Sequence, residues 1–311
     1  MDVATLVAGE ALIDLVPQDK HYVARVGGSP LNLACCLARL GAKAIFTSAV
    51  SEDTFGRAIR TRLDEAGVLP DALQSTTSPS SLALADIDEQ GKANYNFYLK
   101  GTSVEEYRWS DSLSGIGFTH LHLGSYYCCA ETHVQATLEW LAGLPRRITR
   151  SLDVNVRLGL TPGAQRVAGC IDQFVDQFDL IKASDEDLEL LYPGTNPTQL
   201  AREWRARGVN LVVITAGENG GCAFFGDERL DYVAPRVANV VDTIGCGDAF
   251  MAGLLYILGK AEAASVDGAS KMERNRLVQA LDFASDLAAY NCTIKGAGNP
   301  GLEELQAWRM R

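Results

Sequence analysis

The chain has 311 residues, enough for one large α/β domain or two small ones, and its hydrophobic content of 47% supports a sizeable core. A formal net charge of -11 argues against a nucleic acid or an anionic membrane surface as the partner, because both require basic patches. No apolar run approaches the ~18 to 20 residues of a membrane span, and no basic segment followed by an apolar one opens the chain, so we expect a cytoplasmic protein.

Short β-rich runs alternate with helical stretches along the chain. The predicted strands are Thr5–Gly9, Ala44–Val50, His120–Gly124, Arg150–Val154, Leu180–Ala183 and Asn210–Thr215. The predicted helices are Leu31–Leu40, Thr54–Ala66, Thr132–Ala142, Gln165–Phe174, Asp185–Leu191, Gln199–Arg207, Gly247–Leu258 and Glu273–Tyr290. This alternation is typical of an α/β fold in which helices cover both faces of a mostly parallel sheet. Ligands bind beyond the carboxyl ends of the strands in such sheets.

Two stretches interrupt this alternation, because Ala11–Val26 and Ser81–Lys100 are long, strand-like and contain no helix. The second predicts a hairpin of Leu82–Asp88 and Ala93–Leu99, turned at Asp88–Gly91. Such strands form either a lid that excludes water from a reaction or edge hairpins with only a structural role. No domain linker is visible, so we expect all 311 residues to form a single domain with a small β lid.

The segment Gly27 to Asn32 directly precedes a predicted helix. The paired glycines Gly27 and Gly28 let a ligand approach the backbone, and Asn32 offers both a donor and an acceptor. Asp14 lies upstream, and a carboxylate together with an amide suits sugar hydroxyls, which both donate and accept hydrogen bonds. Paired glycines before a helix are weak evidence when taken alone.

A second polar group closes the predicted strand at Arg150–Val154. In Asp153-Val-Asn155-Val-Arg157, strand alternation would place all three polar side chains on one face. Arg157 is either an ordinary surface charge or a partner for a phosphate, to which an arginine is well suited.

The run Asp242-Thr-Ile-Gly245-Cys-Gly247-Asp248 is the most informative segment of the chain. Gly245 and Gly247 permit a tight turn that presents consecutive backbone N–H groups, and the following helix adds its positive N-terminal end. This arrangement predicts an anion site that Asp248 faces. The alternative is that Asp248 only caps the helix, as aspartate often does.

These segments together resemble the PfkB (ribokinase-like) family of carbohydrate kinases. Gly27 to Gly41 resembles the first signature of that family, and Asp242 to Asp248 resembles its second, D-T-x-G-A-G-D. Ser184 to Asp187 occupies the place of the N-x-x-E motif, Thr215 to Gly220 that of T-x-G-x-x-G, and Cys292 to Ala297 that of a loop closing over the adenine. The resemblance implies a three-layer α/β/α sandwich with a β lid.

The resemblance also implies a role for each matching position. Asp248 would be the base that takes a proton from a sugar hydroxyl, while the amides of Gly245, Cys246 and Gly247 hold the charge on the moving phosphate. Arg157 would steady that phosphate or an anionic part of the substrate. The implied sugar-binding positions are Asp14, Gly27, Gly28, Asn32, Lys100 and Arg157. The implied ATP-binding positions are Thr215, Gly217, Gly220, Thr243, Gly247 and Ser285.

Three positions depart from the family pattern. Cys246 replaces the usual alanine, and we expect activity to survive because only its backbone N–H is needed. Ser184 and Asp187 replace Asn and Glu in the motif that organises Mg²⁺ through water, and fructokinase-like members often have this serine. Lys100 stands where an arginine is common among fructokinase-like relatives, so the sugar is less certain than the reaction.

The sequence therefore predicts an ATP-dependent sugar kinase of the fructokinase-like subgroup, acting on a primary hydroxyl with Mg²⁺. A 2-keto-3-deoxygluconate kinase is the first alternative, because Arg157 and Lys100 could receive its carboxylate. A ribokinase or nucleoside kinase is a further alternative, and a catalytically silent sugar-binding protein is an alternative of another class. The resemblance also allows a homodimer through the lid and activation by K⁺.

Overall fold

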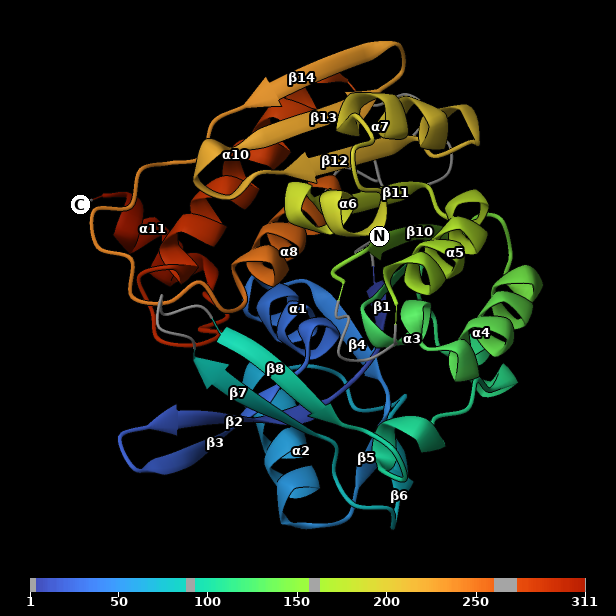
Figure 1. Cartoon of the computed structure of the whole chain (residues 1–311), viewed down its shortest axis with the longest axis vertical. Coiled ribbons are helices and arrows are strands. Elements are labelled where there is room, and N and C mark those ends of the chain that lie inside the picture. Colours follow the sequence, from blue (N-terminus) through green and yellow to red (C-terminus); the bar gives the residue numbers. More distant parts are fainter. Residues whose placement is uncertain (1–3, 88–92, 157–162, 260–272, 311) are drawn as a thin grey trace.

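The computed structural model describes residues 4–87, 93–156, 163–259 and 273–310. Its main feature is an eight-stranded sheet in the order β14-β13-β12-β11-β10-β9-β1-β4 (Figure 1). The strands are β1 (Ala4–Ala8), β4 (Lys43–Thr47), β9 (His120–Gly124), β10 (Thr149–Asp153), β11 (Leu180–Ser184), β12 (Leu211–Thr215), β13 (Gly221–Phe225) and β14 (Glu228–Tyr232). The strands from β12 to β4 are parallel, and β13 and β14 add an antiparallel edge.

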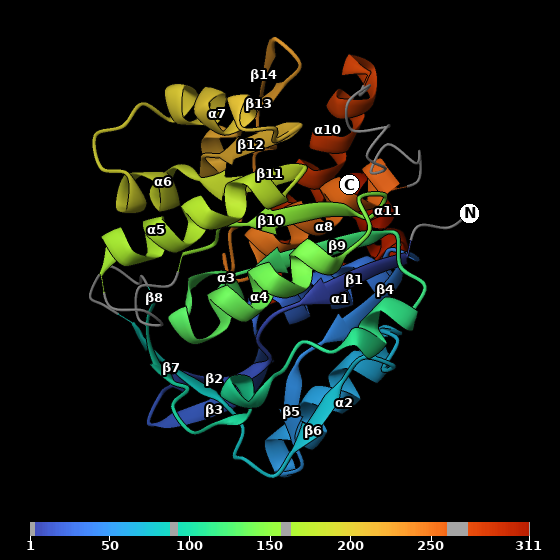
Figure 2. The same cartoon turned by 90° about the vertical axis from the view of Figure 1, so that its right-hand side faces the viewer.

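Helices cover both faces of this sheet (Figure 2). One face packs against α3 (Tyr126–Cys129), α4 (Glu131–Gly143), α5 (Ala164–Phe174), α6 (Asp185–Leu191) and α7 (Pro197–Ala206). The other packs against α1 (Ser29–Arg39), α2 (Thr54–Ala66), α8 (Cys246–Gly259), α10 (Arg274–Asn291) and α11 (Leu302–Arg309). Side chains alternate between the two cores along β1, where Leu6 joins the first and Val7 the second. The expected three-layer α/β/α architecture is confirmed.

The two strand-like stretches form a separate four-stranded sheet in the order β3-β2-β7-β8. Its strands are β2 (Leu12–Gln18), β3 (His21–Gly27), β7 (Leu82–Ile87) and β8 (Ala93–Tyr98), and β2 pairs with β7 in parallel. We call this unit the small sheet. The predicted turn at Asp88–Gly91 lies outside the described residues.

The structure corrects some element predictions. The strand expected at Ala44–Val50 is divided at Ser48, because β5 (Ala49–Ser51) leaves the main sheet and pairs with β6 (Gln74–Thr76). The hairpin of β13 and β14 was missed, although Gly226-Asp227 is a two-residue turn signal and Gly226 has a φ of 49°. The short helix α3 and the C-terminal helix α11 were also missed. Short 3₁₀ turns occupy Ser103–Glu106, Asp111–Gly115, Val175–Gln177 and Gly217–Asn219.

None of the helices in the described ranges is both long enough and apolar enough to cross a membrane.

Candidate active site

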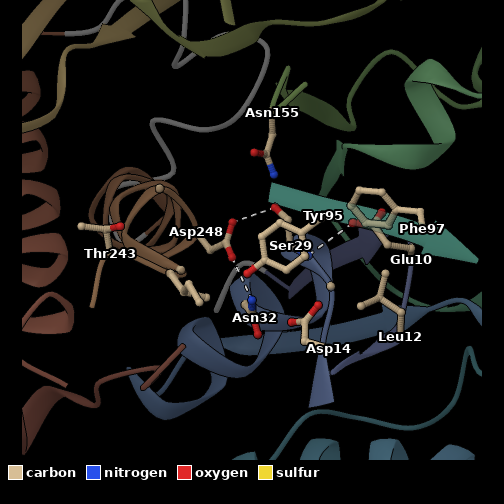
Figure 3. A pocket seen from close by; sticks show the side chains of 14 residues that line it. Glu10, Leu12, Asp14, Ser29, Asn32, Tyr95, Phe97, Asn155, Thr243 and Asp248 are labelled. Carbon is tan, nitrogen blue, oxygen red and sulfur yellow. Dashed lines mark hydrogen bonds between the residues drawn. The ribbon is translucent and has the colours of Figure 1, made fainter. Parts of the chain in front are cut away.

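A cavity opens between the start of α8, the start of α1 and the small sheet (Figure 3). Residues from all three contribute to its wall, together with residues that follow β1 and β10. The lining residues are Glu10, Leu12, Asp14, Gly28, Ser29, Asn32, Tyr95, Phe97, Asn155, Thr243, Ile244, Gly245, Gly247 and Asp248. The cavity therefore brings together the two glycine-containing segments that the sequence singled out, which lie more than 200 residues apart.

Asp248 lies in the first turn of α8 and is only 8% exposed. Its Oδ1 accepts a hydrogen bond from Ser29 Oγ at 2.7 Å, and its Oδ2 accepts one from Asn32 Nδ2 at 2.9 Å (Figure 3). Ser29 and Asn32 are three residues apart in the first turn of α1, so both side chains reach the same carboxylate. Asp248 thus makes contacts across the cavity, beyond any capping of its own helix.

The turn before α8 is fixed by the surrounding chain. Asp242 Oδ1 accepts from the amide of Ile244 at 3.0 Å, and its Oδ2 accepts from the amide of Gly296 at 2.8 Å. Asn291 Nδ2 donates to the carbonyl of Ile244 at 2.9 Å. We call residues 242–248 the anion turn, since this bracing holds its backbone at the positive end of α8.

Gly245 is required by this geometry because its φ is 76° and a Cβ there would lie 2.9 Å from the Cβ of Ala297. Gly245 and Gly247 both line the cavity. The amide of Cys246, expected to face the phosphate, donates to the carbonyl of Thr243 at 3.2 Å in this structure.

Sequence reasoning missed a buried ion pair beside this turn. Lys182 on β11 is 4% exposed, and its Nζ lies 3.1 and 2.9 Å from the two carboxylate oxygens of Asp153 at the end of β10. Burial raises the pKa of Asp153 to about 6, and it acts to lower the pKa of Lys182. The carboxylates of Asp153, Asp187 and Asp248 outweigh that effect and raise the pKa of Lys182. Lys182 in turn acts to lower the pKa of Asp153, as expected for an ion pair.

The expected strand alternation from Asp153 to Asn155 is wrong, because β10 ends at Asp153 and Asn155 has a φ of 34°. Asn155 therefore lines the cavity while Asp153 points to Lys182. The Nδ2 of Asn155 is buried and has no hydrogen-bond partner among the described residues. Figure 3 shows its amide directed toward Asp248 and Ser29. Arg157 lies outside the described residues.

The small sheet supplies the opposite wall of the cavity. Leu12 and Asp14 come from β2, and Tyr95 and Phe97 come from β8, where their spacing of two places both on one face. Their rings stack with centroids 6.1 Å apart. The alternating aromatic residues Tyr95 and Phe97 were the signal that sequence reasoning overlooked.

Glu10, also missed as a site residue, follows β1 and is 4% exposed. Its two carboxylate oxygens accept from the amides of Ser29 at 3.3 Å and Tyr126 at 3.2 Å. Glu10 therefore joins the starts of α1 and α3 at the wall of the cavity. Gly27 ends β3 against the carboxylate of Asp14.

Other predicted site residues do not line this cavity. Lys100 is exposed beyond the end of β8, and Ser285 is buried within α10. Thr215 ends β12, with Gly217 and Gly220 in the turn that follows.

The Ser184 to Asp187 segment forms a capping box at the start of α6. Ser184 Oγ accepts from the amide of Asp187 at 3.0 Å, and Asp187 Oδ2 accepts from the amide of Ser184 at 3.0 Å. Asp187 Oδ1 also accepts from the amide of Val156 at 2.9 Å, which joins α6 to the chain after β10. The structure thus gives both residues a structural role, and their part in binding Mg²⁺ stays a prediction.

The chain is similar in sequence to known proteins over most of its length. The profile of the pfkB family of carbohydrate kinases matches residues 4–305. A fructokinase of Rhizobium leguminosarum bv. trifolii is 33% identical over 279 residues, covering 84% of this chain and 83% of its own.

Solved structures show the same architecture. A fructokinase of Xylella fastidiosa with bound ATP superposes with a TM-score of 0.88 at 24% identity, covering 100% of this chain and 99% of its own. A fructokinase double mutant of Vibrio cholerae O395, bound to fructose, ADP and potassium, superposes with a TM-score of 0.84 at 25% identity, covering 98% of both chains. The chain thus belongs to the pfkB family of carbohydrate kinases and is an ATP-dependent sugar kinase.

Proposed function

We propose that this kinase transfers the γ-phosphate of ATP to a primary hydroxyl of fructose, with Asp248 as the general base. The observation that carries the proposal is the position of Asp248, which ends the anion turn, is held by Ser29 and Asn32, and lines the cavity opposite the small sheet. A carboxylate fixed in this manner can take the proton of a hydroxyl as its oxygen attacks phosphorus.

Around this base, the anion turn suits the transferred phosphate. Phosphoryl transfer depends on positioning and on stabilising charge at the equatorial oxygens, and backbone N–H groups at a helix start serve both needs. Thr243 and Gly247 would contact the phosphates, and the turn that contains Thr215, Gly217 and Gly220 would hold the nucleotide.

On the sugar side, Asp14 and Asn32 offer acceptors and a donor for hydroxyl groups, and Tyr95 and Phe97 offer apolar faces for the carbon atoms of the ring. The buried Nδ2 of Asn155 is a further donor directed at the reacting groups. A small polyol with one reactive primary hydroxyl suits this set of groups.

Mg²⁺ accompanies ATP in this proposal, and Asp187 is the carboxylate that would reach it through water. Hard carboxylate oxygens suit Mg²⁺, which usually keeps several waters. Bound there, the ion would neutralise charge on the phosphates.

Fructose is favoured over 2-keto-3-deoxygluconate because the described residues of the small sheet that line the cavity, Leu12, Asp14, Tyr95 and Phe97, include a carboxylate, which would repel the carboxylate of the sugar acid, while Lys100 is exposed elsewhere. A coupled ADP-release assay over fructose, 2-keto-3-deoxygluconate and ribose tests the choice. We expect fructose to give the highest kcat/KM. Turnover of the sugar acid without turnover of fructose would refute the substrate, and ATP and sugar binding without transfer would favour a silent binding protein.

We also propose a homodimer that forms through the small sheet. Strands β3 and β8 are its two edges, and Tyr22 and Tyr98 on them are each 57% exposed. Light scattering during gel filtration tests this assembly, with a monomer mass contradicting it. Activation by K⁺, the ion bound in the Vibrio cholerae fructokinase structure, is tested by replacing K⁺ with Na⁺ in the assay.

A further inference from the structure

Lys182 is a charged side chain buried in the core of the sheet. Its neighbours Leu180, Ile181 and Ala183 on β11 are buried and apolar, as expected for a central parallel strand. A buried ion pair is costly to desolvate and is often replaceable by apolar residues without loss of stability. A contribution to the stability of the fold therefore does not readily explain the Lys182–Asp153 pair.

The position of the ammonium group suggests another reason. A Cβ added to Gly247 would lie 3.2 Å from Lys182 Nζ, so the group lies directly against the anion turn. The absence of a side chain at Gly247 is what permits this approach.

The charges around Lys182 show what its removal would do. Asp153, Asp187 and Asp248 all interact electrostatically with it. Without the ammonium, three carboxylates would face an incoming triphosphate at low local dielectric, where like charges repel most strongly.

We propose that Lys182 is a positioning residue for phosphoryl transfer: held by Asp153, its ammonium supports the anion turn at Gly247 and offsets the negative charge that accumulates when ATP binds. This inference rests on the proposed kinase function. Lys182 acts indirectly, by supporting the anion turn and by its positive electrostatic field. Asp248 is the group that contacts the sugar.

The test compares variants that keep or remove the charge. Lys182→Met combined with Asp153→Asn removes both charges while nearly preserving shape, and Asp153→Asn alone keeps the ammonium. We expect the double variant to retain its melting temperature within a few degrees, to bind ATP more weakly in calorimetry, and to lose at least about tenfold in kcat with little change in the KM for sugar. Asp153→Asn alone should retain most of the kcat.

A stable double variant with wild-type kcat and ATP affinity would overturn the inference. If the double variant does not fold, a loss of kcat in Asp153→Asn as large as that expected of the double variant would overturn it. Wild-type protein that transfers phosphate to none of the sugars would instead refute the proposed function, and the calorimetric comparison would still test Lys182.

A separate observation concerns two cysteines beside the same turn. Cys246 Sγ and Cys292 Sγ lie 2.8 Å apart, and both residues are only partly buried. The carbonyl of Cys292 accepts from the amide of Val241 at 2.8 Å, so the two segments are held together by more than the sulfurs. The hydrogen bond between the two thiols lowers the pKa of Cys292, which favours its thiolate.

We infer that Cys246 and Cys292 are a site of reversible disulfide formation with a small organic disulfide. The Cys292 thiolate attacks one sulfur of the reagent and releases one thiolate. The Cys246 thiolate then attacks Cys292 Sγ in the mixed disulfide and expels the second, so two protein thiols are oxidised as one disulfide is reduced to two thiols. Closure to the ~2.05 Å of a disulfide requires less than about 1 Å of movement between the sulfurs.

Oxidised glutathione, followed by alkylation and peptide mapping, tests this site independently of kinase activity. We expect a protein lighter by two hydrogens, with a Cys246–Cys292 cross-link that dithiothreitol reverses. Cys292→Ser should abolish the cross-link, whereas Cys222→Ser, at another partly buried cysteine, should not. Alkylation of both thiols after oxidation, or a cross-link between other cysteines, would contradict the inference.

Discussion

The two walls of the cavity are built differently. The anion turn leads into α8, whose residues 249–256 are buried and pack in the same core as α1, and the backbone of the turn is braced by Asp242 and Asn291. The small sheet instead leaves much of β3 exposed, and its wall is made of side chains such as Asp14 and Phe97. A backbone site braced beside a buried helix suits a constant reaction, whereas side chains on a half-exposed sheet can vary with the sugar.

The largest effect is expected from replacing Asp248, the proposed general base, in the first wall. Asp248→Asn keeps an acceptor for Asn32 and can donate to Ser29 Oγ, so the contacts across the cavity survive while the basic group is lost. We expect kcat to fall by about 10²–10⁴-fold. Steady-state kinetics with calorimetric sugar binding measure this, and unchanged turnover would remove Asp248 from the mechanism.

A smaller loss of kcat is expected when Gly245, in the backbone of the same wall, is replaced. Gly245→Ala places a side chain where φ is 76° and where Ala297 lies 2.9 Å from the new Cβ. We expect kcat to fall by at least about tenfold through displacement of the turn. Adding Ala297→Gly relieves only the contact, so recovery in the double variant would mean that crowding, and not backbone conformation, limits Gly245.

Asn155 tests the region where the walls meet. Because its Nδ2 is buried and directed toward Asp248 and Ser29, Asn155→Ala should lower kcat/KM for fructose by roughly tenfold, the value of one hydrogen bond to a polar substrate. Asn155→Asp, which replaces the donor by an acceptor, should lower it further. Equal kcat/KM values for both variants and the wild type would show that the Asn155 amide does not contact the substrate.

The smallest effect concerns the attachment of the small sheet. Asp53 caps α2 through the amide of Gly56 at 2.7 Å and also accepts from the amide and hydroxyl of Ser80, just before β7. Asp53→Ala should lower the free energy of unfolding by about 1 kcal/mol, with kcat unchanged. Urea unfolding measures the difference.

The same contact has a defined pH dependence. Burial acts to raise the pKa of Asp53, but its hydrogen bonds outweigh this and lower the pKa to about 2. An unfolded aspartate titrates near ~3.9, so the contribution is complete above that pH and is lost as pH falls toward 2. The stability gap between wild type and Asp53→Ala should therefore narrow from pH 6 to pH 3, and a constant gap would contradict this assignment.

The sequence predicted the first wall better than the second for a physical reason. The anion turn is a local motif, because its glycines and Asp248 lie within seven residues. The face of β8 depends on pairing register, so Lys100 was chosen where Tyr95 and Phe97 line the cavity.

The positions of Asn155 and Lys182 could not be predicted from local sequence patterns. The backbone of Asn155 departs from strand conformation just after β10. Lys182 meets Asp153 only through the pairing of β10 with β11, although a lysine within an otherwise apolar strand was a usable signal.

The division between the two walls is tested most directly by comparing Phe97→Ala with Tyr98→Ala. These neighbours lie on opposite faces of β8, with Phe97 in the cavity and Tyr98 57% exposed. Phe97→Ala should raise the KM for fructose by about tenfold, as expected for loss of a buried aromatic contact, while kcat and the KM for ATP stay within about twofold. Tyr98→Ala should leave all three unchanged. An equal rise in the KM for ATP with Phe97→Ala, or equal effects of the two variants, would contradict the account.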